Sequence, residues 1–243
     1  MKKSAFRKTI RIAINDIKII FRDKSLLMLA VVPLLIFLLL KFGLPLLVEE
    51  FSILVEFINS ILLVLLILMS IFPSFILSFV VMDEKETSLL QVFNVLPHNY
   101  NFLLNIRIIS SYIAGTVISI FVLYSTSSFY ETKGSLIITA LTISLYGPQV
   151  FLLIVWRSKQ KVEAMTWMKG LNFVYMLPVV LLFVHQPLIH VMAIIPTYWL
   201  FKIQLTEIAV HQFWFATIGI VQSLLYIFLI KKYVNNNMIS SAL

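Results

Sequence analysis

Three acidic side chains of this sequence lie close together between two long apolar runs. Residues 82–97 read MDEKETSLLQVFNVLP, and their charged first half stays in water, because an ionised side chain costs at least about 2.5–3.5 kcal/mol at the centre of a membrane span. Ser88, with Gln91 three residues later, forms a capping box that predicts a short helix ending near Pro97. The apolar residues that share one face of this helix are Leu89, Val92, Phe93 and Leu96. The pattern predicts a water-exposed turn that a partner protein binds.

The residues that bind and hydrolyse ATP are missing. A phosphate loop requires two glycines five positions apart in GxxxxGK[ST], and none of the six glycines has that spacing. Ion-coupled transporters bury acidic or histidine relays inside their spans. The acids outside the predicted cytoplasmic regions fall instead in predicted loops or at span ends: Glu49, Glu50, Glu56, Glu131 and Glu207. The chain is therefore predicted not to be an enzyme, and proton-coupled transport is disfavoured.

A zinc protease is the other chemistry that these residue types could support. Glu49 and Glu50 fall on the same predicted outer side as His185, His190 and His211. No HExxH motif places two imidazoles on one helical face, and the glutamate pair lacks the arginine that the prenyl-protease-like family requires. We interpret the histidines as surface residues and predict no metal site; export of a metal or haem past them is the remaining alternative. Without cysteine there is no disulfide and no thiol chemistry.

The composition identifies a membrane protein. The 243 residues are 60% hydrophobic and 12% charged, with a mean hydropathy of +1.00, outside the range of soluble globular domains. Because a spanning helix takes roughly 20 apolar residues, the sequence predicts an all-α fold with six transmembrane helices. They are expected at about 26–47, 58–81, 103–124, 135–155, 167–184 and 212–230.

Basic residues set the predicted orientation, because lysine and arginine remain on the cytoplasmic side of short loops. With the N-terminus inside, all of the 19 basic residues except Lys41, Lys133 and Lys202 fall on the cytoplasmic side. Arg107 is one of the inside residues. We therefore predict a multi-pass protein of the cell membrane with both termini in the cytoplasm. The net charge of +8 reports this topology and contact with anionic lipids, not a nucleic-acid-binding surface.

Residues 4–23 are too charged to cross a membrane, but their apolar residues form one helical stripe. This pattern predicts an amphipathic helix that lies in the membrane interface. The basic residues of the interfacial helix are Arg7, Lys8, Arg11, Lys18 and Arg22.

Residues 185–211 decide the number of spans. Gln186 and Pro187 interrupt the fifth span, and the apolar run 188–201 covers only about 21 Å as a helix. A seventh span here would also move the basic C-terminal residues outside, against the charge rule. We therefore predict a re-entrant or interfacial segment on the outer face before the last span.

Small residues recur at every fourth position of two predicted spans. They are Ser70, Ser74 and Ser78 in the second span, and Ser111, Gly115 and Ser119 in the third. Close helix packing is the favoured interpretation. A path between two halves of a transporter is the alternative.

The order of these parts resembles the permease subunits of ABC-2 type exporters. A basic interfacial helix, a proline in the first span, a charged turn after the second span and an outer Pro-Thr-Tyr-Trp segment at 196–199 follow one another. The family turn has an E-x-E-x-G-T-x-E-x-L-x-x-x-P-like pattern, and this chain lacks its glycine. The approximate matches are Glu84, Glu86, Thr87, Leu90 and Pro97.

The resemblance implies a single ABC-2 type transmembrane domain over residues 1–243, paired with a second copy or a sister permease. Each permease would dock on a separate ATP-binding subunit, which carries the ATP and Mg²⁺, so that no cofactor binds this chain. Residues 83–97 would be the coupling helix, with Glu84 and Glu86 offering charges to the partner. The residues expected to couple to the ATPase are Asp83, Glu84, Lys85, Glu86, Thr87, Leu89, Leu90, Phe93 and Leu96. The implied activity is ATP-driven export in a bacterial membrane.

The expected substrate is amphipathic or hydrophobic, such as a drug, a peptide or a lipid. Residues that could line its path are Ser70, Ser74, Ser78, Tyr112, Thr116, Asn172 and Tyr175. Two alternatives stay open: a self-sufficient carrier or channel, and a membrane immunity or scaffold protein that binds a toxic peptide without transporting it. A neighbouring gene for an ATPase would favour the exporter.

Overall fold

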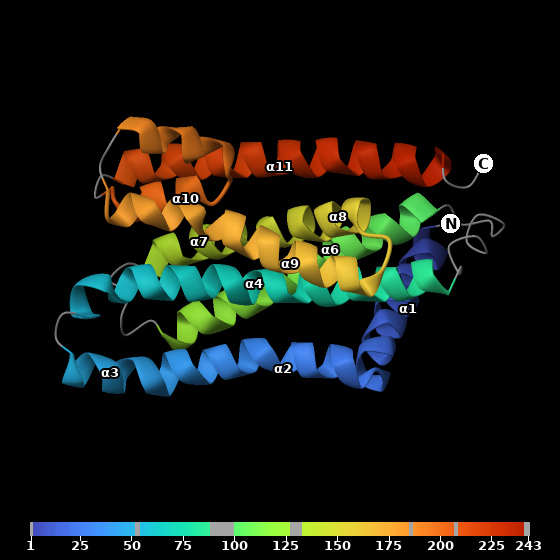
Figure 1. The fold of residues 1–243 in the computed structure, drawn as a ribbon, viewed down its shortest axis with the longest axis horizontal. Coiled ribbons are helices and arrows are strands. Elements are labelled where there is room, and N and C mark those ends of the chain that lie inside the picture. The colour runs from blue at the N-terminus through green and yellow to red at the C-terminus, as the bar shows by residue number, and fades with distance from the viewer. Residues whose placement is uncertain are drawn as a thin grey trace.

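Every regular element in the described part of the chain is a helix (Figure 1). The computed structural model describes residues 2–51, 54–87, 100–126, 133–184, 187–206 and 209–240. In chain order the elements are α1 (Lys2–Arg22), α2 (Lys24–Leu38), η1 (Leu39–Gly43, a π-helical turn), α3 (Leu44–Glu50), α4 (Leu54–Glu86), α6 (Tyr100–Ser125), α7 (Lys133–Ser144), α8 (Tyr146–Arg157), α9 (Lys161–Met176), η3 (Leu177–Leu182) and η4 (Pro187–Ile194), both 3₁₀ helices, α10 (Tyr198–Gln204) and α11 (Ala209–Ser240). The predicted all-α fold is confirmed.

Six helical stretches of the described residues are long and apolar enough to cross a membrane, as predicted. They are Lys24–Glu50, Phe57–Glu86, Asn101–Ser125, Ile137–Arg157, Lys161–Leu182 and Val210–Val234. Successive spans run in alternate directions, so that the beginning of α1 and the end of α11 lie at the same end of the bundle (Figure 1). We call this end the termini end and the opposite one the far end.

The fifth span differs from its prediction, because it begins at Lys161 and not near residue 167. The predicted boundary near residue 167 left out the charged residues Lys161 and Glu163 but included Lys169. Lys161, however, is neutralised by Asp23 and Asp83, and the exposed Lys169 has a side chain long enough to reach toward the interface. Paired or flexible charges at a span end therefore allow the helix to start earlier.

The fourth span is broken into α7 and α8 at Leu145. Pro148 follows the break and has no N–H to bond the carbonyl of Ser144, so the continuous helical ladder is lost there. The N–H of Leu145 bonds the carbonyl of Thr142 instead, at 3.2 Å.

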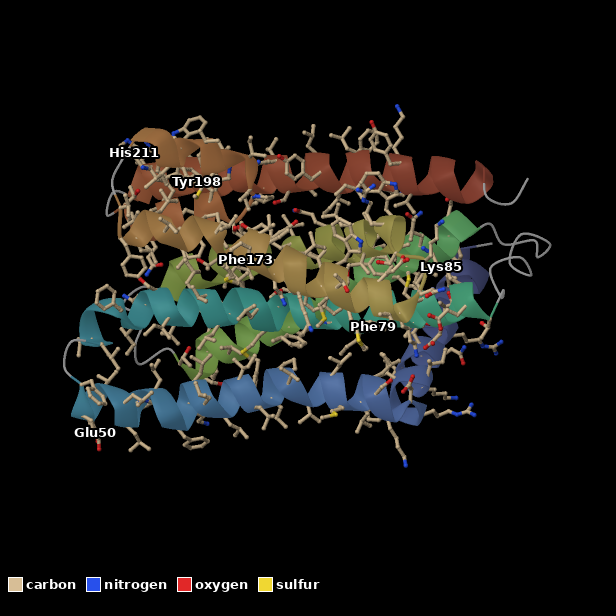
Figure 2. All side chains as sticks on the ribbon, viewed as in Figure 1. Glu50, Phe79, Lys85, Phe173, Tyr198 and His211 are labelled. Atoms are coloured by element: carbon tan, nitrogen blue, oxygen red, sulfur yellow. The ribbon has the colours of Figure 1, made fainter. Side chains whose placement is uncertain are left out.

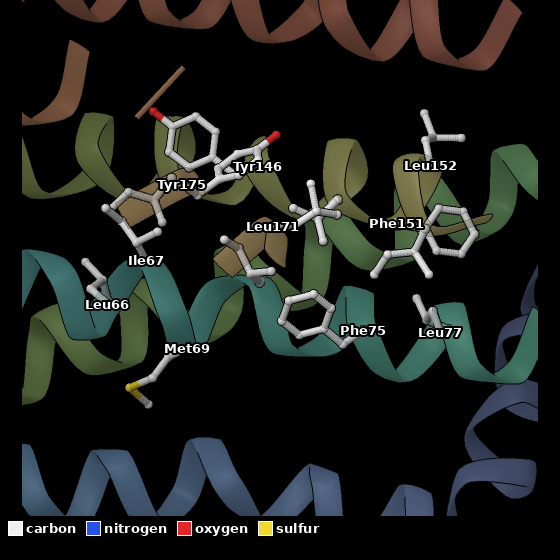
Figure 3. Close-up of a cluster of buried hydrophobic side chains, with 14 of the residues drawn as sticks. Leu66, Ile67, Met69, Phe75, Leu77, Tyr146, Phe151, Leu152, Leu171 and Tyr175 are labelled. Carbon is white, nitrogen blue, oxygen red and sulfur yellow. The ribbon is translucent and has the colours of Figure 1, made fainter. Parts of the chain in front are cut away.

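α4 lies at the centre of the bundle, which explains why this span is apolar on all sides. Its neighbours are α2, α6, α8 and α9. Figure 3 shows Phe75 of α4 in a cluster with Phe151 of α8 and with Leu171 and Tyr175 of α9. The central helix is thus positioned to pass a displacement of its end to its neighbours.

The predicted N-terminal amphipathic helix is α1, which crosses the termini end of the bundle at an angle to the spans (Figure 1). Asp23 separates it from α2 and caps α2, because its side chain accepts a hydrogen bond from the Ser25 N–H at 2.8 Å. α1 therefore turns into the first span through a single capping residue.

The segment before the last span is re-entrant, one of the two forms predicted. η4 leads in from the far end, residues 195–197 form a turn, and α10 returns to the far end (Figure 1). Gln222 of α11 donates to the carbonyls of Ala193 and Ile194 at 2.9 and 2.8 Å. Gln222 lies twelve residues from Val210, where the sixth span begins, which is about 18 Å along a helix. The turn therefore lies beside the middle of the sixth span.

Candidate functional site

The charged end of α4 is bonded to three other helices of the chain. Lys85 lies at the termini end of the bundle, opposite Glu50 (Figure 2). Each of the four charged residues from Asp83 to Glu86 contacts a partner on α6, α8 or α9. The sequence predicts that a partner protein binds this turn. Its described part, residues 83–87, lies where α4 and α6 meet α1, α8 and α9.

Arg107 of α6 holds Glu84 of α4 and Asp16 of α1 together, and we call these three residues the Arg107 clamp. Its Nη1 and Nη2 donate to the two oxygens of Glu84, both at 2.6 Å. Its Nε and Nη2 donate to Asp16 at 3.0 and 2.9 Å. Both contacts are bidentate, the geometry in which guanidinium and carboxylate groups bind most strongly. The exposed fractions are 1% for Arg107, 5% for Asp16 and 7% for Glu84, so the clamp is shielded from water and salt.

Lys161, the first residue of α9, connects three segments, and we call the set Lys161, Asp23, Asp83 and Glu86 the Lys161 bridge. Its Nζ lies 2.5 Å from Asp83 and 3.3 Å from Asp23. Its backbone N–H donates to Glu86 at 2.7 Å, which satisfies one of the unpaired donors at a helix N-terminus. The bridge ties the start of α2 and the start of α9 to the end of α4.

Lys85 caps the end of α8. Its Nζ donates to the carbonyl of Val155 at 2.5 Å and to that of Ser158 at 2.8 Å. A cation at a helix C-terminus satisfies free carbonyls and interacts favourably with the helix dipole. Together with the clamp and the bridge, this contact links the end of α4 to α1, α2, α6, α8 and α9.

The predicted ATPase-coupling residues fall into two groups. Asp83 to Glu86 have the contacts above, and Thr87 donates from its hydroxyl to the Asp83 carbonyl at 2.6 Å. The apolar residues lie outside the described part of the chain: Leu89, Leu90, Phe93 and Leu96. Binding of a partner by this turn stays a prediction, while Glu84 and Glu86 also have partners within the chain.

The predicted basic face of the interfacial helix is exposed where side chains are described, at Arg11, Lys18 and Arg22. The side chains of Arg7 and Lys8 lie outside the described part. Arg11 and Lys18 line a cavity of about 510 Å³ beside the Arg107 clamp.

Sequence reasoning did not identify Arg107, Asp16 or Lys161 as site residues. Arg107 was used only as a marker of topology, although an ionised residue inside a span requires a partner. Asp16 is the only acidic residue among residues 2–22. A single acid on a basic helix was the other sequence feature that could have indicated a buried ion pair.

The serine ladder of α4 is buried within this subunit. Ser70, Ser74 and Ser78 are 0% exposed. A Cβ added to Gly115 of α6 would lie 2.9 Å from the Ser70 carbonyl oxygen, and one added to Gly147 of α8 would lie 2.5 Å from the Ser74 Oγ. This close approach supports the packing interpretation, and a role of the ladder in the path stays a prediction.

The other residues predicted to line a path lie on α6 and α9. Thr116 is half-buried and donates to the carbonyl of Tyr112 at 2.8 Å. Tyr175 is buried and donates to Gln149 at 2.8 Å. The Oδ1 of Asn172 is buried and has no hydrogen-bond partner among the described residues. Their contact with a substrate stays a prediction.

Replacing Gly147 by alanine is expected to lower the free energy of unfolding by about 1–3 kcal/mol, because the added methyl overpacks the contact with Ser74. The control is Gly170→Ala in α9, where no atom lies within 4 Å of an added Cβ. We expect the control to be neutral or slightly stabilising. The midpoint of heat-induced loss of monodisperse protein in detergent measures both. Equal midpoints for the two variants would show that the bundle does not depend on this close approach.

Comparison with models of known protein families gives a match over most of the chain. Residues 16–231 match the model of a family described as Rv2686c-like, fluoroquinolones export permease protein Rv2686c-like. Searches of curated proteins and of solved structures gave no match to the chain. The matched region includes the first five spans, most of the sixth, and every residue of the clamp and the bridge.

Proposed function

This chain belongs to the Rv2686c-like family of fluoroquinolone export permeases, and from that premise we propose that it is the membrane-spanning subunit of an ATP-driven ABC exporter. It is a multi-pass membrane protein with an export role. In the proposed complex, residues 1–243 form one ABC-2 type domain, and a second permease completes the path. A separate subunit binds ATP and Mg²⁺.

The observation that carries this proposal is the set of contacts around the end of α4. Residues 88–97 connect α4 to α6, and the helix end before them is bonded to α6, α8 and α9 and, through Arg107, to α1. A force applied to residues 88–97 by a partner is therefore carried into several helices at once. A loop that merely connects two spans has no need of a buried, doubly bidentate arginine beside it.

The proposed cycle uses this rigidity. Closure of two ATP-binding subunits displaces the segment 88–97, and the clamp and the bridge make α1, α4, α6 and α9 move as one body. α4 is central and packs on α2 and α8, so its displacement changes the spacing of the helices around the path. In this proposal the chain forms the path, and α4 with the helices bonded to it transmits the movement. The ATPase supplies the free energy.

The orientation in this proposal places the termini end in the cytoplasm of a bacterial cell. The end of α4, the start of α9 and both ends of the described chain lie at that end (Figure 1), and the clamp and the bridge bond the end of α4 there. The excess of basic residues there supports this orientation, because such residues are retained on the cytoplasmic side. The proposed substrate is an amphipathic, drug-like molecule, the class to which the fluoroquinolones in the family's name belong.

Co-purification tests the proposal. The tagged chain is expressed with its neighbouring genes and purified in detergent, and a nucleotide-hydrolysing subunit is expected in stoichiometric amount. Replacing Leu89 and Phe93 together by serine is expected to lower the amount of this subunit at least tenfold, because the apolar face of residues 88–97 is lost.

The matched control is Phe51→Ser, which removes an exposed aromatic ring between α3 and α4 at the far end of the bundle. It is expected to retain the ATPase at the wild-type level. A wild-type chain that purifies alone would overturn the proposal and leave a carrier, a channel or a peptide-binding immunity protein as the explanation.

A further inference from the structure

A cavity of about 510 Å³ lies where α1 crosses the termini end of the bundle, between α1, α4 and α6 (Figure 1). Its lining includes Glu84, two residues before the end of the second span, and Leu103, two residues after the start of the third span. The stretches that can cross a membrane therefore end at this cavity, at the depth where lipid headgroups lie. The volume falls within the roughly 300–1,000 Å³ of sites that bind small molecules.

One face of α1 supplies unpaired hydrogen-bond donors to the cavity. Arg11, Asn15 and Lys18 follow one another at i, i+4 and i+7, the spacing that puts side chains on one helical face, and all three are lining residues. In the described part of the chain, neither Arg11 nor Lys18 has an ion-pair partner. Both cations are therefore available to a ligand.

The two carboxylates that line the cavity are already bonded. All four oxygens of Asp16 and Glu84 accept hydrogen bonds from Arg107, at 2.6, 2.6, 2.9 and 3.0 Å. Three cations and two carboxylates thus line the cavity, which leaves one positive charge in excess. A ligand group with a single negative charge matches this excess.

A phosphodiester is such a group. It carries one negative charge, and its oxygens accept the charge-assisted hydrogen bonds that arginine and lysine donate. Arg11 and Lys18 are seven residues apart, which is about 10.5 Å along a helix, and their long side chains can converge on one group from the two sides. The Asn15 amide lies between them as a further donor.

The apolar side of α1 favours a lipid as the source of the phosphodiester. Ile14, Ile17 and Phe21 are exposed on this amphipathic helix, as expected for a helix whose apolar face meets acyl chains. Ile14 also lines the cavity. A lipid can therefore place its phosphodiester between the two cations and its acyl chains along Ile14. Basic pockets at the cytoplasmic ends of membrane helices bind anionic headgroups in this way.

We propose that this cavity binds one phosphodiester group between Arg11 and Lys18, and that an anionic phospholipid of the leaflet at the termini end supplies it. That leaflet is the inner one in the orientation proposed above. The site goes beyond the export function, and it differs from a general attraction of basic residues to anionic membranes because it assigns one lipid to one cavity. The bound headgroup lies against the Arg107 clamp, where α1, α4 and α6 meet.

Native mass spectrometry of the purified chain tests the proposal, with phosphatidylglycerol and phosphatidylcholine offered at equal concentrations. Both lipids contain a phosphodiester, but the choline ammonium cancels its charge in the second. The wild type is expected to retain one phosphatidylglycerol, with a preference of at least about tenfold over phosphatidylcholine. Arg11→Gln with Lys18→Gln is expected to retain the two lipids about equally.

The matched control is Arg22→Gln with Lys24→Gln. It removes the same charge at the same end of the bundle, from exposed residues that do not line the cavity, and it is expected to keep the wild-type preference. Asn15→Trp tests the shape of the site, because it fills the space between Arg11 and Lys18 without changing any charge. It is expected to lower the retained phosphatidylglycerol at least about fivefold.

Soluble glycerophosphoglycerol, the same headgroup without acyl chains, distinguishes a lipid from a free phosphodiester. A large excess is expected to leave the lipid bound. Displacement would keep the phosphodiester site and refute the lipid as its source.

Equal retention of the two lipids by the wild type, equal loss of preference in the two double variants, or unchanged binding by Asn15→Trp would each overturn the proposal. The export function is tested separately by the ATPase that co-purifies. A chain without the lipid site that still retains the ATPase keeps that function, and a chain that binds the lipid but no ATPase keeps the site alone.

Discussion

Replacing Arg107 by glutamine is expected to lower the free energy of unfolding by about 3–5 kcal/mol and to abolish export. The substitution leaves the buried carboxylates of Asp16 and Glu84 without a cation, and removal of one partner from a buried ion pair has this cost. The loss of monodisperse protein on heating measures stability, and drug efflux from cells that express the complex measures export. Arg22→Gln, on the exposed surface of α1, is the control and is expected to change stability by less than about 0.5 kcal/mol.

A triple variant separates the clamp's effect on folding from its effect on coupling. Asp16→Asn, Glu84→Gln and Arg107→Gln together leave no buried charge, so we expect most of the lost stability to return. Neutral side-chain hydrogen bonds between membrane helices are worth only about 0.6 kcal/mol on average. The three helices are then held loosely, and drug-stimulated ATP hydrolysis is expected to stay low. A triple variant as unstable as Arg107→Gln alone would contradict this electrostatic explanation.

The clamp is better explained by coupling than by stability. Apolar residues of the same volume often replace a buried ion network without loss of stability, so holding the bundle together does not require charges here. A doubly bidentate arginine instead fixes the relative orientation of three helices. Helices that transmit a movement from a partner protein need such a fixed relative orientation.

Much of the fold could be predicted from the sequence because hydrocarbon imposes simple rules. Six apolar runs and the positions of basic residues were enough for the spans and their alternating directions. The re-entrant segment was predictable because its apolar run is too short to cross. The boundary of the fifth span was not, because Lys161 can begin a span only when Asp23 and Asp83 neutralise it.

The candidate site was predictable only in part, because its contacts join distant positions. The turn that begins at Asp83 was found from its charge between apolar runs. Its partners were not found, since Arg107 and Asp16 are 91 positions apart and no local pattern pairs them. The sequence-based interpretation assigned Glu84 to a partner protein, and the structure bonds that carboxylate to Arg107. A charge at a span end has several possible partners, and only the packed helices select one.

Two side chains of the last span, Gln222 and Tyr226, bond the re-entrant segment. Gln222 accepts a hydrogen bond from Trp199 Nε1 at 2.5 Å and donates to the carbonyls of Ala193 and Ile194. Tyr226 donates to the Ile194 carbonyl at 2.8 Å. Residues 195–197 are non-helical backbone beside the middle of the sixth span, and within a membrane such backbone is tolerated only where the protein satisfies its polar groups. Neighbouring backbone groups and Tyr146 bond the polar groups of the turn, and Gln222 and Tyr226 bond the carbonyls directly before it.

Replacing Gln222 by leucine is therefore expected to lower the free energy of unfolding by about 2–4 kcal/mol and to reduce drug efflux at least tenfold. The variant leaves the Trp199 N–H without its acceptor and the Ala193 carbonyl without its side-chain donor, and each buried unpaired group costs about 1–3 kcal/mol. Thermal loss of monodisperse protein and efflux of a fluorescent drug are the measurements. Export is expected to fall because the re-entrant segment loses contacts that hold it against α11.

Gln212→Leu in the same helix is the matched control, because Gln212 has a single bond to the Thr206 carbonyl near the far end. It is expected to cost less than about 1 kcal/mol and to keep export. If Gln222→Leu behaves like Gln212→Leu, hydrophobic packing alone holds the segment, for instance the stacking of Trp199 on Phe215 at 6.0 Å between ring centroids. Loss of export with unchanged stability would instead place Gln222 in the path itself, because an intact bundle that no longer transports has lost a substrate contact and not a structural one.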